Sequence, residues 1–451
     1  MSTPDRPFPS HSTTTELDAF ITDLNGNQRG KRIRATAADS LIENGFKLPR
    51  SVMGLDFWGD DVIENGLVFE TGDNDGICKV LGNTPKPTPW ESGEHFHMMA
   101  TMSNPDGTPF AADPRQILSR VVERYTAQGL QPVVAAELEF YLLDIASEKA
   151  GHPIPSPLLP QTGFDCPNAY SINDLDRFHA ILEAIRAACE AQDIPADAII
   201  AELGDGQFEV NLLHVDDPLL AADQSILFKR TVRSIARQHG HLASFMAKTY
   251  GDKSGNGFHL HFSLLDKQGN NVFAGETPKG SELLRHAVGG MLHAMPASML
   301  IFAPHLNSYR RLQPGTHAPT SANWGYENRT VAVRIPDSNP AARRIEHRVA
   351  GADANPYLVM AAILSAAFYG IEHKLEPSDA VIGNGYSEKH AGEPLPYQWA
   401  DAINRLRGSS LLKQLLGKEF VRVFTAVKDQ ELNKFNRRVT DAEYATYLGT
   451  V

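Results

Sequence analysis

The sequence has few cysteines and lacks the segments that direct a chain into a membrane or out of the cell. Its 451 residues include only Cys78, Cys166 and Cys189, whose odd number and wide spacing fit neither a disulfide framework nor a zinc site. The N-terminal stretch carries no apolar core of a secretory signal. The longest nearly apolar run, residues 357–371, is shorter than the ~20 residues of a membrane span. We therefore expect a cytoplasmic protein in a reducing compartment, with no membrane partner.

Basic residues are also scarce relative to acidic ones. The 42 Lys and Arg against 54 Asp and Glu give a formal net charge of −12, and no basic block stands out in the sequence. We therefore expect neither nucleic acid nor an anionic membrane surface as a partner. The 42% hydrophobic and 21% charged residues are typical of a globular chain. A single hydrophobic core rarely extends over a chain of this length, so we expect two or three domains.

Helix and strand signals divide the chain into two unequal parts of an α+β fold. Residues 15–112 mix short apolar runs with glycine and proline, which predicts a small strand-rich domain. Within it we expect a helix over residues 16–24 and strands over residues 32–36, 51–56 and 66–70. Residues 113–451 form the larger predicted domain, where apolar residues recur at helical spacing. The elements expected there are a strand over residues 133–144 and helices over residues 114–129, 175–193, 218–239, 281–302 and 356–371.

Four predicted strands place polar side chains on one face. Successive strand residues point to opposite faces, so alternate residues collect on one side. The segments are 136–140 (AELEF), 207–211 (QFEVN), 258–263 (FHLHFS) and 344–348 (RIEHR). The ordinary explanation is a sheet with one solvated face. It accounts for each segment alone, but lysine, which solvated faces normally carry, is missing from all four.

These polar residues suit divalent metal ions and an anionic substrate. The candidate metal ligands are five carboxylates and one imidazole: Glu137, Glu139, Glu202, Glu209, Glu346 and His259. Such oxygen-rich sets suit Mg²⁺ or Mn²⁺ rather than Zn²⁺, and without cations the carboxylates would repel one another. Planar donors for carboxylate and phosphate oxygens are available from Arg311, Arg329, Arg334, Arg344 and Arg348. Metal and arginine without a covalent nucleophile are typical of phosphoryl transfer, although no Walker-type GxxxxGK[ST] motif occurs.

Seven segments resemble the glutamine synthetase family. They are AELEFYLLD (136–144), AELGDGQFEVNL (201–212), GNGFHLHFSL (255–264), NSYRRLQPG (307–315), ENRTVAVRIP (327–336), ARRIEHR (342–348) and DANPYL (353–358). They follow the family's order, and the resemblance extends over roughly residues 15–450. It implies a small β-grasp N-terminal domain and a large catalytic domain whose antiparallel sheet carries the active site. It also implies homo-oligomers, a hexameric ring or a dodecamer of two rings, with active sites shared between subunits.

The same resemblance implies a role for each matching residue. One Mg²⁺ or Mn²⁺ ion would be held by Glu139, Glu202 and Glu209. A second ion, next to the phosphates of ATP, would be held by Glu137, His259 and Glu346. The glutamate substrate would contact Gly255, His259, Arg311 and Arg348. The nucleotide would contact His261, Ser263 and Arg344, and the transferred phosphoryl group would be neutralised by Arg329 and Arg334.

The chain departs from ammonia-using members of the family at two places. Those members carry a glutamate six residues after the arginine equivalent to Arg311, where this chain has His317. Their Asp-Gly-Ser-Ser segment is also missing, and Asp56 in residues 54–59 (GLDFWG) is only a loose substitute. Fewer carboxylates should weaken the capture of a small ammonium ion. His317 is then either a general base or an incidental loop residue.

Other segments are most similar to the glutamate–polyamine ligases, the γ-glutamylputrescine synthetase-like branch. They are residues 73–75, 88–90 and 320–325 (TSANWG). We therefore expect an ATP-dependent ligase that joins glutamate to an amine larger than ammonia, such as putrescine or another alkyl or aryl amine. The aromatic residues that would contact such an amine, or that otherwise belong to the hydrophobic core, are Trp58, Trp90 and Trp324. The alternatives are a glutamine synthetase proper, a non-catalytic structural member of the fold and, more distantly, a guanidino-kinase-like phosphotransferase.

Overall fold

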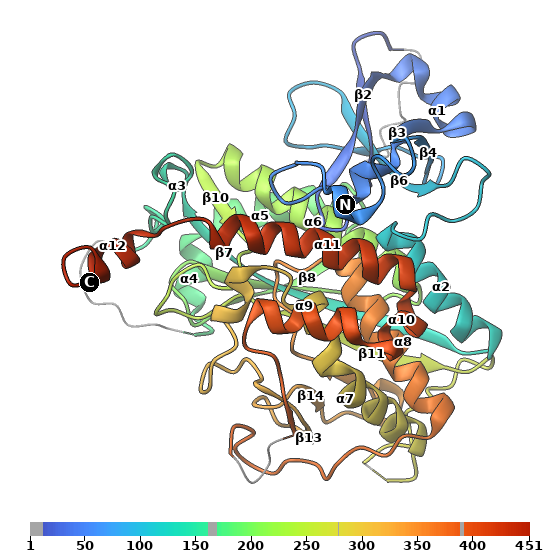
Figure 1. The fold of residues 1–451 in the computed structure, drawn as a ribbon, viewed down its shortest axis with the longest axis vertical. Coiled ribbons are helices and arrows are strands. Elements are labelled where there is room, and N and C mark those ends of the chain that lie inside the picture. The colour runs from blue at the N-terminus through green and yellow to red at the C-terminus, as the bar shows by residue number, and fades with distance from the viewer. Residues whose placement is uncertain (1–11, 161–168, 278, 388–391) are drawn as a thin grey trace.

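The computed structural model describes residues 12–160, 169–277, 279–387 and 392–451. In this part of the chain two large sheets and their helices build an α+β fold, which confirms the predicted class (Figure 1). Cys78 and Cys189 are buried free thiols, and Cys166 lies outside the described residues. Among the described residues, no helix is both long enough and apolar enough to cross a membrane.

The N-terminal part is a small sheet with one helix. Its order is β2-β1-β6-β4-β3, with β5 paired to β6. The elements are β1 (Glu16–Thr22), β2 (Gln28–Arg34), α1 (Ala38–Asn44), β3 (Phe46–Pro49), β4 (Asp75–Val80), β5 (Lys86–Pro87) and β6 (His95–Ser103). In Figure 1 they lie at the top of the molecule, above the helices of the larger part. This agrees with the small β-grasp domain that we expected, while its boundary at residues 112/113 stays a prediction.

The predicted helix over residues 16–24 is wrong, because this segment is strand β1. Leu17, Ala19 and Ile21 are almost fully buried, and their period of two turns one face of the strand to the core. Hydrogen bonds to β2 on one side and β6 on the other satisfy its backbone. The strands predicted over residues 51–56 and 66–70 are also wrong. Arg50–Gly54 is a 3₁₀ helix, and residues 66–70 form turns and bends.

The larger part is organised around an eight-stranded sheet. Its order is β13-β14-β15-β11-β7-β9-β8, with β10 paired to β7. The strands are β7 (Gln131–Asp144), β8 (Ala196–Ala201), β9 (Gln207–Leu212), β10 (His241–Ser244), β11 (Phe258–Leu265), β13 (Trp324–Tyr326), β14 (Val333–Ile335) and β15 (Ile345–His347). A separate pair joins β12 (Ser321–Ala322) to β16 (Glu393–Pro394). Every pairing in the large sheet is antiparallel except that of β13 with β14.

The five helices predicted for this part are present, whereas those over residues 146–150 and 399–447 were not predicted. The helices are α2 (Pro114–Ala127), α3 (Ala146–Ala150), α4 (Ile172–Arg177), α5 (His179–Glu190), α6 (Pro218–Gln238), α7 (Glu282–Phe302), α8 (Pro356–His373), α9 (Trp399–Gly408), α10 (Ser410–Leu416), α11 (Lys418–Asn436) and α12 (Asp441–Tyr447). One predicted helix, over residues 175–193, is two helices that meet at Phe178. Helix α8 begins as expected, because the Asn355 side chain accepts a hydrogen bond from the Tyr357 N–H at 3.0 Å.

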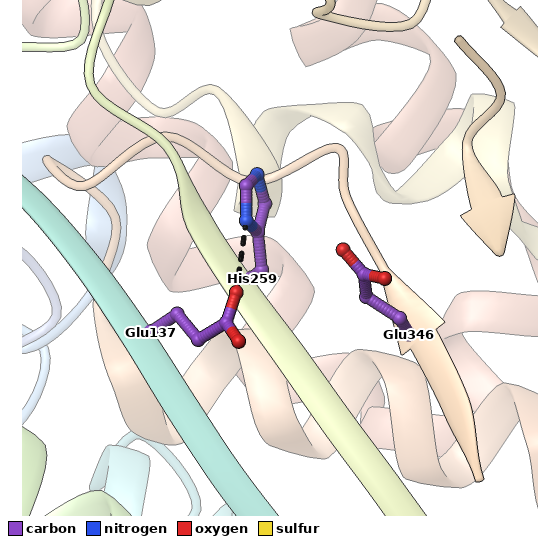
Figure 2. Close-up of side chains that lie close together, drawn as sticks. All are labelled: Glu137, His259 and Glu346. Carbon is purple, nitrogen blue, oxygen red and sulfur yellow. Dashed lines mark hydrogen bonds and ion pairs between the residues drawn. The ribbon is translucent and has the colours of Figure 1, made fainter. Parts of the chain in front are cut away.

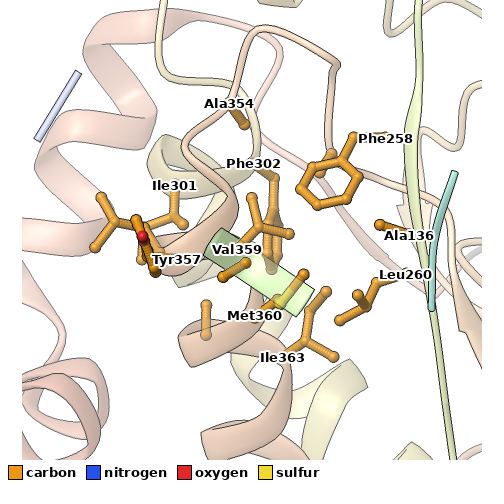
Figure 3. Packing of buried hydrophobic residues seen from close by; sticks show 14 of the residues in the cluster. Ala136, Phe258, Leu260, Ile301, Phe302, Ala354, Tyr357, Val359, Met360 and Ile363 are labelled. Atoms are coloured by element: carbon orange, nitrogen blue, oxygen red, sulfur yellow. The ribbon is translucent and has the colours of Figure 1, made fainter. Parts of the chain in front are cut away.

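The apolar face of the large sheet packs against the long helices. Figure 3 shows Ala136 of β7 and Leu260 of β11 beside Met360 and Ile363 of α8, all members of one buried cluster. Neighbouring residues on the same strands must point the other way. The apolar packing therefore fixes which face of β7 and β11 is left for polar side chains.

Candidate active site

Strand register brings the polar residues of four strands together. The pairs that lie directly opposite each other are His259–Glu137, Glu209–Glu139 and His261–Glu346. Side chains in directly opposite positions have Cβ atoms roughly 5 Å apart. The alternation visible in the sequence therefore becomes one polar patch on the sheet.

Two sets of side chains in this patch are close enough to hold metal ions. The ligand atoms of Glu137, His259 and Glu346 lie within 4.8 Å of one another, and so do those of Glu139, Glu209 and His259. Figure 2 shows the Glu137 and Glu346 carboxylates on either side of His259. The Nδ1 atom of His259 lies 3.3 Å from Glu137 Oε2. Carboxylate-rich sets with one imidazole fit Mg²⁺ or Mn²⁺.

Glu202 belongs to neither set among the described residues. It follows β8, and its backbone N–H donates to the Gln207 carbonyl at 2.9 Å. Burial and the nearby Glu139 carboxylate raise the pKa of Glu202 to about 7, so its side chain is still close to the patch. The predicted grouping of Glu202 with Glu139 and Glu209 stays a prediction.

The carboxylates of the patch repel one another unless a positive charge lies nearby. Burial, with Glu137 and Glu139 nearby, raises the pKa of Glu209 to about 9. Burial would raise the pKa of Glu137 as well, but contacts with His259 and His261 outweigh it and lower this pKa. Packed carboxylates keep protons only when no cation offsets their repulsion. The donor set therefore fits divalent metal ions on its chemistry as well as on its geometry.

Removing divalent metal is expected to make the protein less stable as pH rises. The pKa of Glu209 rises from 4.5 to about 9 on folding. Between these values the folded chain holds a proton that the unfolded chain has lost, so the free energy of unfolding falls with rising pH. Thermal unfolding in EDTA should show a Tm that decreases from pH 6 to pH 9, and excess Mn²⁺ should remove this trend. In Glu209→Gln the slope in EDTA should be smaller; an equal slope in both proteins would contradict the assignment.

Glu346 links the acidic patch to two arginines. Its Oε2 atom accepts a hydrogen bond from Arg334 Nη1 at 2.7 Å, and its Oε1 atom accepts one from Arg348. Burial would raise the pKa of Glu346, but Arg348, two histidines and Arg334 lower it to about 2. In the described part of the chain, the buried Nε atoms of Arg334 and Arg348 have no hydrogen-bond partner. A buried N–H donor without an acceptor costs free energy. We therefore expect an anionic ligand to supply the missing acceptor oxygens.

Arg311 lies in a narrow space between two glycines. A Cβ at Gly255 would come within 2.8 Å of Arg311 Cγ, and one at Gly257 would come within 2.9 Å of His259 Nε2. The Gly257 N–H donates to Glu139 Oε2 at 2.8 Å. Only glycine lets the backbone approach these functional groups so closely. The structure thus brings the predicted substrate residues Gly255 and Arg311 next to the acidic patch.

Three polar residues without a predicted role support this arrangement. Gln207 Nε2 donates to the Gly255 carbonyl at 3.0 Å and to Asn256 Oδ1 at 2.9 Å. Glu327 accepts a hydrogen bond from Arg334 Nη2 at 3.1 Å. Gln207 shares a strand face with Glu209, so strand alternation could have identified it as a residue of the site. Asn256 and Glu327 lie outside the strands, where no periodicity marks them.

A pocket of about 910 Å³ opens beside Glu137. Its lining includes His261, Ser263 and Arg344, the three residues predicted to face the nucleotide, and apolar side chains such as Leu220. Arg344 Nε donates to His261 Nδ1 at 3.2 Å. A lining that combines polar and apolar side chains suits a ligand with a charged part and a flat apolar part.

The remaining predicted residues are less closely tied to these groups, although the Arg329 charge acts on Glu202 and Glu327. Arg329 and His317 are exposed, and His317 has a positive φ of 58°, which is uncommon for a residue other than glycine. Asp56 is fully buried; it accepts a hydrogen bond from Gln430 Nε2 at 2.9 Å and pairs with Lys434 of α11. The Asp56 carboxylate is thus already paired within the chain, and its role toward an amine stays a prediction.

Comparison with known proteins assigns the chain to a family. Residues 111–447 match the family described as glutamine synthetase, catalytic domain. The chain belongs to the glutamine synthetase family. The γ-glutamylputrescine synthetase PuuA of Escherichia coli (strain K12) is 42% identical over 440 residues, which cover 96% of this chain and 91% of that protein.

A second curated relative and a solved structure are also similar over nearly the whole chain. The γ-glutamylethanolamide synthetase GlnA4 of Streptomyces coelicolor is 32% identical over 425 residues, covering 93% of this chain and 90% of that protein. A solved structure described as a GmaS/ADP complex has a TM-score of 0.83 and 28% identity, and the match covers 96% of each chain. The predicted family and its resemblance to glutamate–amine ligases are therefore confirmed.

Proposed function

We propose that this chain is an ATP-dependent ligase that joins the γ-carboxylate of glutamate to an amine larger than ammonia. The observation that carries the proposal is the pair of acidic sets that share His259, directly beside two buried arginines with unpaired Nε donors. Ligands for divalent cations next to donors for anions are what phosphoryl transfer between two anionic substrates requires.

The reaction would proceed in two steps. A γ-carboxylate oxygen of glutamate attacks the terminal phosphorus of ATP, ADP leaves, and γ-glutamyl phosphate forms. The amine nitrogen then attacks the acyl carbon, phosphate leaves, and the nitrogen gives up a proton as the amide forms. Mg²⁺ or Mn²⁺, when bound, would offset the charge on the phosphate oxygens.

The side chains would divide the work by their positions. Arg311 and Arg348 would hold glutamate beside the Gly255 backbone, and Arg334 with Arg329 would neutralise the phosphoryl group. Holding both anions in line removes most of the entropic cost of the encounter. The nucleotide would occupy the pocket lined by His261, Ser263 and Arg344. No step needs a nucleophilic serine or cysteine.

The preference for a larger amine rests on what replaces the ammonium-binding groups. His317 occupies the position where ammonia-using members carry a glutamate, and the Asp56 carboxylate is already paired with Lys434. The relatives are named for a putrescine and an ethanolamide product, which supports the same preference. Glutamine synthetase proper remains the alternative that an assay must separate.

An amine panel tests the proposed function. Phosphate release should be measured with glutamate, ATP and Mg²⁺ or Mn²⁺ and one amine at a time: ammonium, putrescine, spermidine, ethanolamine, isopropylamine or benzylamine. We expect release that depends on one of the larger amines, with putrescine foremost, and a kcat/KM for ammonium at least about 10²-fold lower. Efficient turnover of ammonium alone would identify a glutamine synthetase, and no turnover with any amine would favour a structural member of the fold.

His317→Glu is expected to increase the use of ammonium. A carboxylate carries a full negative charge and therefore attracts a small cation more strongly than an imidazole does. We expect kcat/KM for ammonium to rise about tenfold while that for putrescine falls. His317→Gln keeps a similar size without a charge or a base and is the matched control. If both variants lose the native amine and neither gains ammonium, His317 acts as a base rather than as a selectivity residue.

We further propose that the chain assembles into the rings that the family resemblance implies. A hexamer or a pair of hexamers would share active sites between neighbouring subunits. Mass photometry at nanomolar concentration should show six or twelve chains per particle. An active monomer would rule out shared sites.

A further inference from the structure

A second pocket, of about 430 Å³, has a lining that shares no residue with the predicted nucleotide pocket. Its walls come from the turn between β1 and β2, from helices α6 and α11, and from β10 and the residues after it. None of its lining residues belongs to the acidic patch or to the predicted nucleotide pocket. The lining residues that matter below are Phe57, Lys229, Arg233, Phe245, Met246 and Phe435.

Arg233 gives this pocket an uncompensated positive charge. Among the described residues, its one recorded interaction is with the Phe245 ring, whose centroid lies 5.2 Å from the guanidinium carbon. Part of the side chain is exposed, yet burial lowers the pKa of Arg233 and no neighbouring carboxylate opposes this. An arginine without an acidic partner in a partly desolvated pocket is expected to attract an anion.

The other charges of the pocket are already compensated. Lys229 donates to the Ala352 carbonyl at 2.7 Å and the Ala354 carbonyl at 3.3 Å, so its ammonium group is held away from a ligand. Burial, with Arg233 nearby, also lowers the pKa of Lys229 to about 7. Glu431 forms a buried ion pair with Lys428 at 2.9 Å. Asp353 also lines the pocket; it accepts a hydrogen bond from Ser308 at 2.6 Å, and the charges of Lys229 and Arg311 act on it. Among the charged lining residues, Arg233 is therefore the one without a partner of opposite charge.

The same pocket exposes apolar side chains. Phe57 is 53% exposed and Met246 is 47% exposed, and both line the pocket together with Phe245 and Phe435. Large apolar groups gathered around a concave surface are typical of a ligand site. Their position beside Arg233 calls for a ligand with a flat apolar body and one anionic group.

We propose that this pocket is a second small-molecule site, for an aryl anion whose carboxylate or phosphate pairs with Arg233 and whose ring packs on the Phe57, Met246 and Phe435 side chains. The site does not depend on the proposed ligase reaction. Its ligand therefore binds in the presence of ADP and glutamate.

Calorimetric titration with defined probes tests this site. Phenylacetate and phenyl phosphate carry both features, phenylacetamide lacks the charge, and acetate lacks the apolar body. Each is titrated into the full chain with ADP, Mg²⁺ and glutamate at saturating concentrations. We expect at least one of the two aryl anions to bind once per chain, and phenylacetamide and acetate to bind at least about tenfold more weakly.

Three variants on the same helix make the result specific. Arg233→Gln should weaken the binding of the aryl anion at least about tenfold, whereas Arg233→Lys should retain most of it. Arg237→Gln is the matched control, because Arg237 lies one turn further along α6 and pairs with the exposed Glu148. Unchanged Tm values would show that the variants fold. Absence of binding by both aryl anions, or equal binding by Arg233→Gln and the parent protein, would overturn the proposal.

Discussion

Glu346→Gln is expected to reduce kcat for amide formation by about 10²–10³-fold, the loss typical of removing one preorganised electrostatic group. The substitution keeps the shape of the side chain but removes its negative charge. Glu346 is one of the three groups around the predicted metal position with Glu137 and His259, and it also accepts from Arg334 and Arg348. The substitution therefore weakens a metal ligand and removes the negative charge that orients the Arg334 and Arg348 guanidiniums.

The measurement is a steady-state assay with the best amine of the panel, repeated over a range of Mn²⁺ concentrations. Glu148→Gln is the matched control, since Glu148 is exposed and pairs with Arg237 at the surface, and it should retain full activity. A Glu346→Gln enzyme within tenfold of the parent at saturating Mn²⁺ would remove Glu346 from the catalytic site.

Arg311→Lys is expected to raise KM for glutamate by about 10²-fold, with a smaller change in kcat. Arg311 is buried, and its Nη1 donates to the Val349 carbonyl at 2.9 Å, which fixes the plane of the guanidinium. A lysine ammonium group cannot reproduce a planar fork for a carboxylate. The separation of KM from kcat distinguishes lost substrate binding from lost chemistry.

The neighbouring Arg310 provides the control for this prediction. It is exposed and precedes Arg311 in the same segment, so Arg310→Lys should leave KM for glutamate unchanged. An Arg311→Lys enzyme with normal KM and reduced kcat would assign Arg311 to the chemical step instead of to glutamate binding.

The parts of the site that could be predicted are those carried by strand periodicity. Glu137 and His259 alternate with apolar neighbours, and burial of Ala136, Phe258 and Leu260 beside α8 leaves one direction for the polar side chains (Figures 2 and 3). The register then brings them together, because β11 pairs with both β7 and β15. Alternation thus predicted which residues face the site but not which of them share a metal.

Long-range pairing explains what could not be predicted. Residues 16–22 contain a short apolar run that suits a helix or a strand, and the deciding partner, β6, lies more than 70 residues away in the sequence, with Glu16 opposite His95. Asp56 was assigned from its place in a motif, whereas its contacts come from Gln430 and Lys434 of α11. No local pattern reports such partners.

The most direct measurement of the central claim is a competition for product. The protein is incubated with glutamate, ATP, Mn²⁺ and equal concentrations of ¹⁵N-ammonium and putrescine, and the products are identified by mass spectrometry. We predict that γ-glutamylputrescine predominates over ¹⁵N-glutamine by at least about 10²-fold and forms with one ADP and one phosphate per amide. Predominant ¹⁵N-glutamine would show that the chain is a glutamine synthetase, and phosphate release without either amide would contradict the ligase mechanism itself.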